Sequence, residues 1–227
     1  MKQIVALFDC DGTIFSAGFG RGLIKYTAAN GGEWRVRGLY AALLLPYIIR
    51  KTKLITSESF LRSLMARLAW LIKGWDEEQV RIAFEWVVHE YLRPTQQEDV
   101  VARLRDHQAK DHKVLLVSAQ FIPALILYGT FLAIDGVIGT QIELVDGRYT
   151  GRIIPPMITT KQKAVAAQEY FASRAIEVDW AESFAYADSI TDSDLLNLVG
   201  TPIAVYPDAK LHMLAQRKNW EILGIPK

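Results

Sequence analysis

The sequence is poor in cysteine, since Cys10 is the only one among its 227 residues. A single thiol forms neither an intramolecular disulfide nor a CxxC metal site, which excludes a disulfide-stapled or zinc-ribbon domain. Net charge is also almost absent, because 26 lysines and arginines offset 25 aspartates and glutamates, so nothing indicates a nucleic-acid partner. The amino-terminal apolar run, residues 4–8, is too short for a signal peptide, and we expect a cytoplasmic protein.

Long hydrophobic runs are absent as well. The longest, residues 39–49, has eleven residues and contains Pro46, whereas a membrane-spanning helix needs about 20. We therefore expect no transmembrane segment. Basic residues flank this run: Arg35, Arg37, Arg50, Lys51 and Lys53. A buried helix with solvated ends is the ordinary interpretation, and a helix lying on a membrane surface is the alternative.

Four short apolar runs predict buried strands. They are residues 4–8, 114–117, 184–187 and 203–206. Runs that are apolar on both faces are typical of parallel sheets covered by helices. Three of the four are followed by a polar residue, namely Asp9, Ser118 and Asp188. Because ligands bind beyond the carboxyl ends of the strands in open α/β sheets, these residues predict one shared site.

About a hundred residues separate the first two predicted strands, far more than a crossover needs. Their patterns predict helices. Ser57 is the expected N-cap of one helix, Asp76 opens a second with a capping box, and Pro94 ends it. A further capping box, starting at Thr95, precedes the helix that leads into the second strand. We therefore expect a helical insertion at residues 16–93 within a core formed by residues 1–15 and 94–227.

A second, smaller insertion is predicted after the second strand. Asp146 and Gly147 lie between two β-prone segments, residues 137–145 and 148–153. An Asp-Gly pair in this setting is the strongest short-range signal of a β-hairpin. We expect a structural hairpin without a catalytic role.

The first strand ends in two carboxylates, Asp9 and Asp11, which are one residue apart. Two ionised carboxylates at close range are costly unless a divalent cation or a shared proton compensates them. The pair therefore indicates a metal site or acid–base chemistry. The alternative is an acidic turn in which Asp11 or Thr13 caps the next helix.

The other strand ends allow the same two interpretations. Ser118 is either a helix N-cap or, with the amides of Ala119 and Gln120, part of an anion site at a helix start. Asp188 and Asp192 are either capping residues or a second acidic pair. The four features occur together, in order and at strand ends, which favours a common site.

Taken together, these residues resemble the haloacid-dehalogenase-like hydrolase superfamily, in particular its phosphoserine-phosphatase-like branch. The family motifs are DxDx(T/V), a Ser or Thr at a strand end, a Lys and an acidic DxxxD. Here they correspond to Asp9/Asp11/Thr13, Ser118, Lys161 and Asp188/Asp192. The resemblance implies an α/β fold: a Rossmann-like parallel sheet core with a helical cap inserted after the first strand. Lys161 is preferred to Lys163 because Ala164 and Val165 follow it at the family spacing, and Lys163 stays open.

The resemblance also implies a Mg²⁺-dependent phosphatase. Asp9 would be the nucleophile that forms a phosphoaspartate, and Asp11 the general acid and then the general base. The remaining roles would be as follows: Asp9, the Asp11 backbone carbonyl and Asp188 for Mg²⁺; Ser118, the Ala119 amide and Lys161 for the phosphoryl oxygens; Asp192 and Thr13 in support around them.

The substrate departs from the family pattern. Phosphoserine phosphatases carry a Glu nine positions after the nucleophile, and this sequence has Gly18 there. We therefore expect a small phosphate ester other than phosphoserine. The insertion is rich in Trp, Leu and Tyr, which suits an apolar tail on that ester. A phosphotransferase that uses the same intermediate and a catalytically silent phosphate-binding module are the alternatives.

Overall fold

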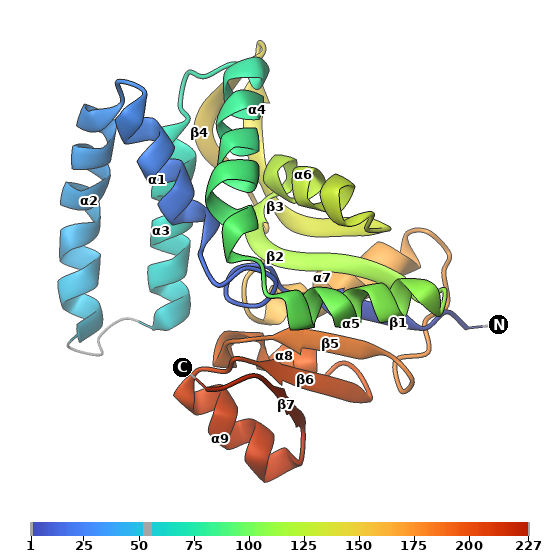
Figure 1. Cartoon of the computed structure of the whole chain (residues 1–227). Coiled ribbons are helices and arrows are strands. Elements are labelled where there is room, and N and C mark those ends of the chain that lie inside the picture. Colours follow the sequence, from blue (N-terminus) through green and yellow to red (C-terminus); the bar gives the residue numbers. More distant parts are fainter. Residues whose placement is uncertain (1, 52–55, 227) are drawn as a thin grey trace.

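A computed structural model of the chain describes residues 2–51 and 56–226 (Figure 1). Among them, seven strands form one sheet in the order β4-β3-β2-β1-β5-β6-β7. The strands are β1 (Val5–Phe8), β2 (Lys113–Phe121), β3 (Gly136–Val145), β4 (Arg148–Ile154), β5 (Phe184–Ala187), β6 (Thr201–Val205) and β7 (Glu221–Leu223). All neighbours pair in parallel except β3 and β4. The predicted α/β class with a parallel core is confirmed.

The central strand β1 shows why these runs are apolar throughout. Its four residues are fully buried. Ala6 and Phe8 belong to the hydrophobic cluster on one face of the sheet, and Val5 and Leu7 to the cluster on the other. Because side chains alternate along a strand, a sheet covered on both faces needs apolar residues at every position.

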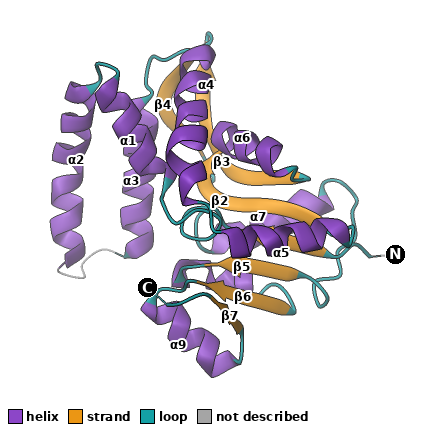
Figure 2. Cartoon of the chain, in the orientation of Figure 1, coloured by secondary structure: helices purple, strands orange, loops and turns teal. Residues whose placement is uncertain are grey.

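Helices cover both faces of the sheet (Figure 2). Helices α5 (Glu98–Ala109) and α6 (Ile122–Leu132) contribute to the cluster that contains Phe8. Helices α7 (Lys161–Ala172), α8 (Ser193–Leu196) and α9 (Ala209–Lys218) contribute to the cluster that contains Leu7. The molecule is therefore layered helix, sheet, helix, and the carboxyl ends of β1, β2 and β5 meet at one edge.

The predicted hairpin is present. Strands β3 and β4 pair antiparallel, with Val145 opposite Arg148. Asp146 and Gly147 form the turn, both with positive φ, 49° and 71°, as the hairpin turn with two left-handed residues requires. The hairpin packs against the helices described next, so it links them to the sheet.

Between β1 and β2 the chain forms a group of helices that stands beside the sheet in Figure 1. They are α1 (Phe19–Ala29), α2 (Glu33–Lys51), α3 (Ser57–Leu71) and α4 (Glu77–Trp86), followed by a π-helical segment η1 (Val87–Leu92) and a 3₁₀ turn η2 (Arg93–Thr95). The division of the chain at residues 16 and 93 stays a prediction, since the hairpin and the helices pack together.

Two of the three predicted helix starts need correction. The capping box of α4 is present, with Asp76 and Gln79 bonded reciprocally. Helix α3 begins one residue earlier than expected, because Thr56 rather than Ser57 is its N-cap. The capping box at Thr95 is wrong: its hydroxyl donates to the Leu92 carbonyl, and Gln97 precedes α5 without a side-chain cap. The Thr95 hydroxyl thus satisfies the carbonyl of Leu92 at the end of η1 and does not cap α5.

Helix α2 contradicts the ordinary interpretation of residues 39–49. The helix continues through Pro46, but it is not buried. Leu39 is buried, whereas Leu44, Leu45 and Ile48 are half or more exposed. Lys53 lies outside the described residues. Within residues 2–51 and 56–226, no helix has both the length and the apolar character that crossing a bilayer requires.

Candidate active site

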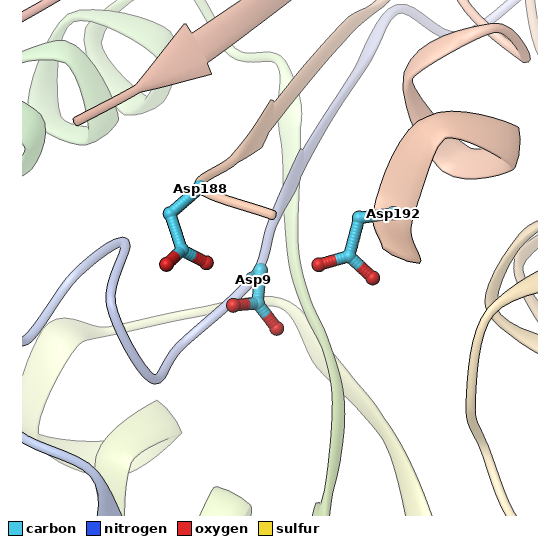
Figure 3. Close-up of side chains that lie close together, drawn as sticks. All are labelled: Asp9, Asp188 and Asp192. Carbon is cyan, nitrogen blue, oxygen red and sulfur yellow. The ribbon is translucent and has the colours of Figure 1, made fainter. Parts of the chain in front are cut away.

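Three carboxylates converge at the carboxyl edge of the sheet (Figure 3). Asp9 directly follows β1, Asp188 directly follows β5, and Asp192 ends the 3₁₀ turn η3 (Ile190–Asp192). One oxygen of each lies within 4.8 Å of one oxygen of the others. Because β1 and β5 are neighbouring parallel strands, residues 179 positions apart become adjacent when the strands pair.

The residues around Asp9 fix its side chain. Thr13 is fully buried, and its hydroxyl donates to Asp9 Oδ2 at 3.4 Å. Gly12 lies between Asp11 and Thr13 with φ 90°, a conformation that favours glycine, and this turn folds the chain back beside Asp9. The sequence prediction that Thr13 supports Asp9 is consistent with this geometry.

Asp11 lies in a different environment, although it is only two residues away. Its Oδ1 accepts a hydrogen bond from the Phe19 amide at 3.1 Å, and its Oδ2 accepts one from the Gln120 side chain. Burial raises the pKa of Asp11 to about 7, with the Asp9 charge acting in the same direction and the two hydrogen bonds opposing it. Burial and the neighbouring Asp9 charge thus favour the protonated form of Asp11 more than in a free carboxyl group.

The cationic partner of the cluster is Lys163, and the choice of Lys161 is corrected. Lys163 Nζ lies 2.7 Å from Asp9 Oδ1 and 2.7 Å from Asp192 Oδ1, and the residue is 5% exposed. Lys161 is exposed and lines a neighbouring hollow with Glu58 and Asp194. Helix α7 begins at Lys161, and two residues later the side chain points to nearly the opposite side, because each residue turns the helix by about 100°.

A signal for Lys163 was present in the sequence. The buried residues of α7 are Lys163, Ala167 and Phe171, which recur every fourth position. A lysine in register with a buried face is a better candidate than one that merely opens the helix. Burial opposes the Lys163 charge, but the Asp192 and Asp9 carboxylates outweigh it and raise the pKa of the ammonium, so Lys163 stays charged.

Strand β2 supplies polar groups through an irregularity rather than through a helix start. Ser118, Ala119 and Gln120 line the same pocket as the carboxylates. The expected helix does not begin until Ile122, since β2 runs on to Phe121. The register with β3 shifts between Val117 and Phe121, and such a bulge redirects side chains at a sheet edge.

Two side chains that sequence reasoning did not assign, those of Gln120 and Asp208, help to build the site. Gln120 binds the Asp11 side chain, as described above. Asp208 is the N-cap of α9, and its Oδ2 also accepts from the Ser189 hydroxyl and the Ile190 amide, both at 3.0 Å. Asp208 thereby holds the loop that carries Asp188 and Asp192. A carboxylate at the end of a fourth parallel strand was the available signal.

The pocket has a volume of about 200 Å³. Its charged lining residues are Asp9, Asp11, Asp188, Asp192 and Lys163, so carboxylates outnumber the cation. Leu61 and Met65 of α3 form an apolar wall on the side of the helical group. Carboxylates supply the hard oxygen ligands that a small divalent cation prefers. The single ammonium group of Lys163 offsets only part of their negative charge.

Comparison with known proteins identifies the family. The haloacid dehalogenase-like hydrolase family matches residues 6–197. This chain belongs to that family. It is 33% identical over 173 residues to a histidinol-phosphatase of Neisseria meningitidis, covering 74% of each sequence. It is 30% identical over 159 residues to an "inhibition of morphological differentiation protein" of Streptomyces azureus, covering 70% of this chain but only 56% of that relative.

Solved structures show the same fold for this haloacid dehalogenase-like hydrolase. A Bordetella pertussis protein of unknown function matches with a TM-score of 0.86 at 25% identity, over 99% of both chains. A phosphoserine phosphatase in its apo form matches with a TM-score of 0.66 at 18% identity, over 100% of this chain and 94% of that one. The second likeness supports the fold alone.

Proposed function

We propose that this protein is a Mg²⁺-dependent phosphatase that hydrolyses a phosphate monoester through a phosphoaspartate on Asp9. One observation carries the proposal: oxygens of Asp9, Asp188 and Asp192 lie within 4.8 Å of one another, with Lys163 bonded to two of the three. The histidinol-phosphatase among the relatives supports the reaction class. The single cysteine supports a cytoplasmic location.

The donor set fits Mg²⁺. Mg²⁺ prefers hard oxygen ligands at about 2.1 Å, and the carboxylate oxygens of Asp9, Asp188 and Asp192 within 4.8 Å of one another would supply such ligands. We assign the ion to Asp9, the Asp11 backbone carbonyl and Asp188, with Asp192 beside them. When bound, the ion offsets the excess negative charge of the pocket and of the phosphoryl group.

The first chemical step joins Asp9 to phosphorus. A carboxylate oxygen of Asp9 attacks, the bond from phosphorus to the ester oxygen breaks, and Asp11 gives its proton to the departing oxygen. Lys163, the Ser118 hydroxyl and the Ala119 amide hold the non-bridging oxygens, whose charge they stabilise in the transition state. The raised pKa of Asp11 supports its part in this step.

The second step releases phosphate. Asp11, now ionised, removes a proton from water, the water oxygen attacks phosphorus, and the Asp9 carboxylate leaves. In the pocket Asp11 has hydrogen-bond partners of its own, the Phe19 amide and the Gln120 side chain, whereas Asp9 is bonded to Thr13 and Lys163. These different environments support different roles for the two carboxylates.

We further propose that residues 16–93 act as a cap and that the substrate carries an apolar tail. The wall formed by Leu61 and Met65 supports this, because it faces the pocket from α3. Gly18, which lies beside the Asp11 carboxylate, occupies the position of the Glu found in phosphoserine phosphatases. Its lack of a side chain supports a substrate other than phosphoserine. A series of phosphate esters with increasing chain length tests the tail: kcat/KM that does not rise with length contradicts it.

A panel of phosphate monoesters, assayed with Mg²⁺ and with EDTA, tests the function. We expect phosphate release that EDTA abolishes and Mg²⁺ restores. In ¹⁸O-labelled water one labelled oxygen should enter each released phosphate, because water attacks phosphorus. Transfer to an added alcohol in place of labelling would indicate a phosphotransferase, and no release from any ester would favour a binding module.

A further inference from the structure

Helix α2 has apolar side chains on two sides. Its inner side, with Val36 and Leu39, is buried in the helical group, where α2 packs against α1 and α3. Its outer side carries Trp34, Tyr40, Leu44, Leu45, Tyr47 and Ile48, which are 46–64% exposed. We call these six residues the α2 face. A helix that is apolar all round is normally buried all round.

The α2 face is a concentrated feature. Of the fourteen large hydrophobic side chains exposed in the described part of the chain, six lie within it. Residues 40, 44 and 48 recur every fourth position and so lie on one side of the helix. Figure 1 shows α2 at the outer edge of the helical group, with α1 and α3 between it and the sheet. The face therefore points away from the rest of the molecule.

The charge of this region is mostly positive. Residues 33–57 contain five basic residues and one acidic residue, Glu33, whereas the whole chain has a net charge of +1, which leaves the remainder net negative. Arg37 lies on the same side of the helix as Tyr40, and its side chain is 83% exposed. It lies 3.7 Å from the Glu33 carboxylate, an ion pair that water screens because both side chains are exposed. Arg50, Lys51 and Lys53 follow the face at its other end in the sequence.

Two other arginines of this region have partners beyond α2. Arg35 donates to the Leu71 and Lys73 carbonyls at 2.7 Å each, and the Arg50 guanidinium lies 5.0 Å from the centre of the Phe60 ring. They fix α2 against α3 and still add positive charge close to the face. The result is an apolar surface with tryptophan and tyrosine on it and basic residues before and after it.

A second copy of the chain is a poorer occupant than a bilayer. In a two-fold dimer the face would meet its own copy, so five basic residues of each copy would face a region whose only acid between positions 33 and 57 is Glu33. An anionic lipid surface complements the same charges, and Trp and Tyr are enriched where hydrocarbon meets headgroups. The eleven-residue run is about 16 Å long as a helix, too short to cross a hydrocarbon core of about 30 Å.

We infer that the α2 face docks on the surface of an anionic phospholipid bilayer, with α2 lying in the plane of the interface. Leu44, Leu45 and Ile48 then enter the boundary between headgroups and acyl chains, and Arg37 contacts the lipid phosphates. Trp34 and Tyr40 lie at headgroup depth. This inference concerns binding alone and does not depend on the proposed reaction.

Flotation of the full chain with vesicles tests the docking. We expect the protein to float with vesicles of phosphatidylcholine and phosphatidylglycerol, to float far less with phosphatidylcholine alone, and to be released in part by added salt. The double variant L44Q/I48Q should weaken binding at least about tenfold, because it removes two apolar groups from the interface. Arg37→Gln should weaken binding to the anionic vesicles about fivefold, as one basic residue near such a surface contributes.

Met213→Gln is the matched control. Met213 is 62% exposed on α9, comparable with Leu44 and Ile48, and its replacement should leave flotation unchanged. Absence of the wild-type protein from the floated anionic vesicles overturns the inference, and so does flotation that L44Q/I48Q leaves unchanged. A dimer in sedimentation equilibrium that L44Q/I48Q dissociates would also overturn it, by assigning the face to a second copy.

Discussion

In the pocket at the sheet edge, charged side chains are buried, and along the α2 face apolar side chains are exposed. The buried charges of the pocket are compensated in part, because Lys163 Nζ lies 2.7 Å from a carboxylate oxygen of both Asp9 and Asp192. The α2 face has large apolar side chains that are 46–64% exposed, although Trp34 also packs edge-to-face on Trp70 of α3. Helix α3 separates the two regions, with Leu61 and Met65 toward the pocket. The buried charges of the pocket are thus paired in part within the chain, whereas the apolar side chains of the α2 face remain exposed.

The largest expected effect removes the nucleophile. Asp9→Asn should lower phosphatase kcat by at least about 10⁴-fold, since an amide oxygen does not form the phosphoaspartate. L44Q/I48Q should stay within about twofold of wild type on a water-soluble ester, because the α2 face does not line the pocket. Circular dichroism checks that both variants are folded. Activity retained in Asp9→Asn would remove Asp9 from its role.

The next comparison separates the two lysines of α7. Lys163→Met should lower kcat/KM at least about 100-fold, because it removes a donor to the phosphoryl oxygens, and Lys161→Met should change it less than about threefold. Lys163→Met also leaves Asp9 and Asp192 buried without their cation, so Mg²⁺ should restore part of its thermal stability. Equal losses in the two variants would contradict the assignment of Lys163.

Mg²⁺ binding should be visible without any substrate. A ligand present at about 100 times its Kd stabilises the folded state by roughly 2.7 kcal/mol, so Mg²⁺ should raise the thermal midpoint of the wild-type protein. Asp188→Asn should reduce that rise, because it removes one of the clustered carboxylates, whereas L44Q/I48Q should keep it. Differential scanning calorimetry with EDTA and with Mg²⁺ measures both. An unchanged rise in Asp188→Asn would contradict the proposed ligand set.

The smallest expected effect is a pH dependence of stability within the sheet core. His107 lies on the buried side of α5, where its Nε2 is 2.8 Å from the Tyr186 hydroxyl and its Nδ1 is 2.9 Å from His112 Nδ1. Burial lowers the pKa of His107 from 6.5 to about 4, with the neighbouring His112 acting in the same direction. The folded state therefore keeps His107 neutral over a range in which the unfolded state takes up a proton.

The sign follows directly. The contribution of His107 is fully present above pH 6.5 and is lost as the pH falls toward 4, on the order of 1–3 kcal/mol of unfolding free energy. Urea unfolding at several pH values measures it. His107→Gln should flatten this part of the profile, and replacement of the exposed His89 should not. An unchanged profile in His107→Gln would locate the effect elsewhere.

The strand ends were predictable because burial on both faces leaves a distinctive sequence. Phe8 and Ala187 each end an apolar run, and the next residue of each, Asp9 and Asp188, lies in the pocket. Parallel pairing then brings them together whatever the length of the insertion between them. The family resemblance added the roles, which sequence chemistry alone left open between catalysis and capping.

Other features depend on contacts that a local pattern does not contain. The choice of Lys161 rested on Ala164 and Val165 at the family spacing, but Val165 is 49% exposed, and the buried side of α7 carries Lys163, Ala167 and Phe171. The edge strand β7 has three residues and is identified only by its pairing with β6. The burial of α2 was predicted wrongly. An apolar composition does not tell whether other residues of the same chain cover the helix, and here they leave one side of it exposed.

Cys10 gives the molecule an internal reporter. It lies between Asp9 and Asp11, it is fully buried, and burial together with these two charges raises the pKa of its thiol well above the usual value. A disulfide reagent such as DTNB therefore reacts at a single atom of this sequence, and only while the end of β1 is open. The rate of that reaction measures how often the chain around Cys10 opens to solvent. A tightly bound phosphate mimic such as vanadate should lower this rate.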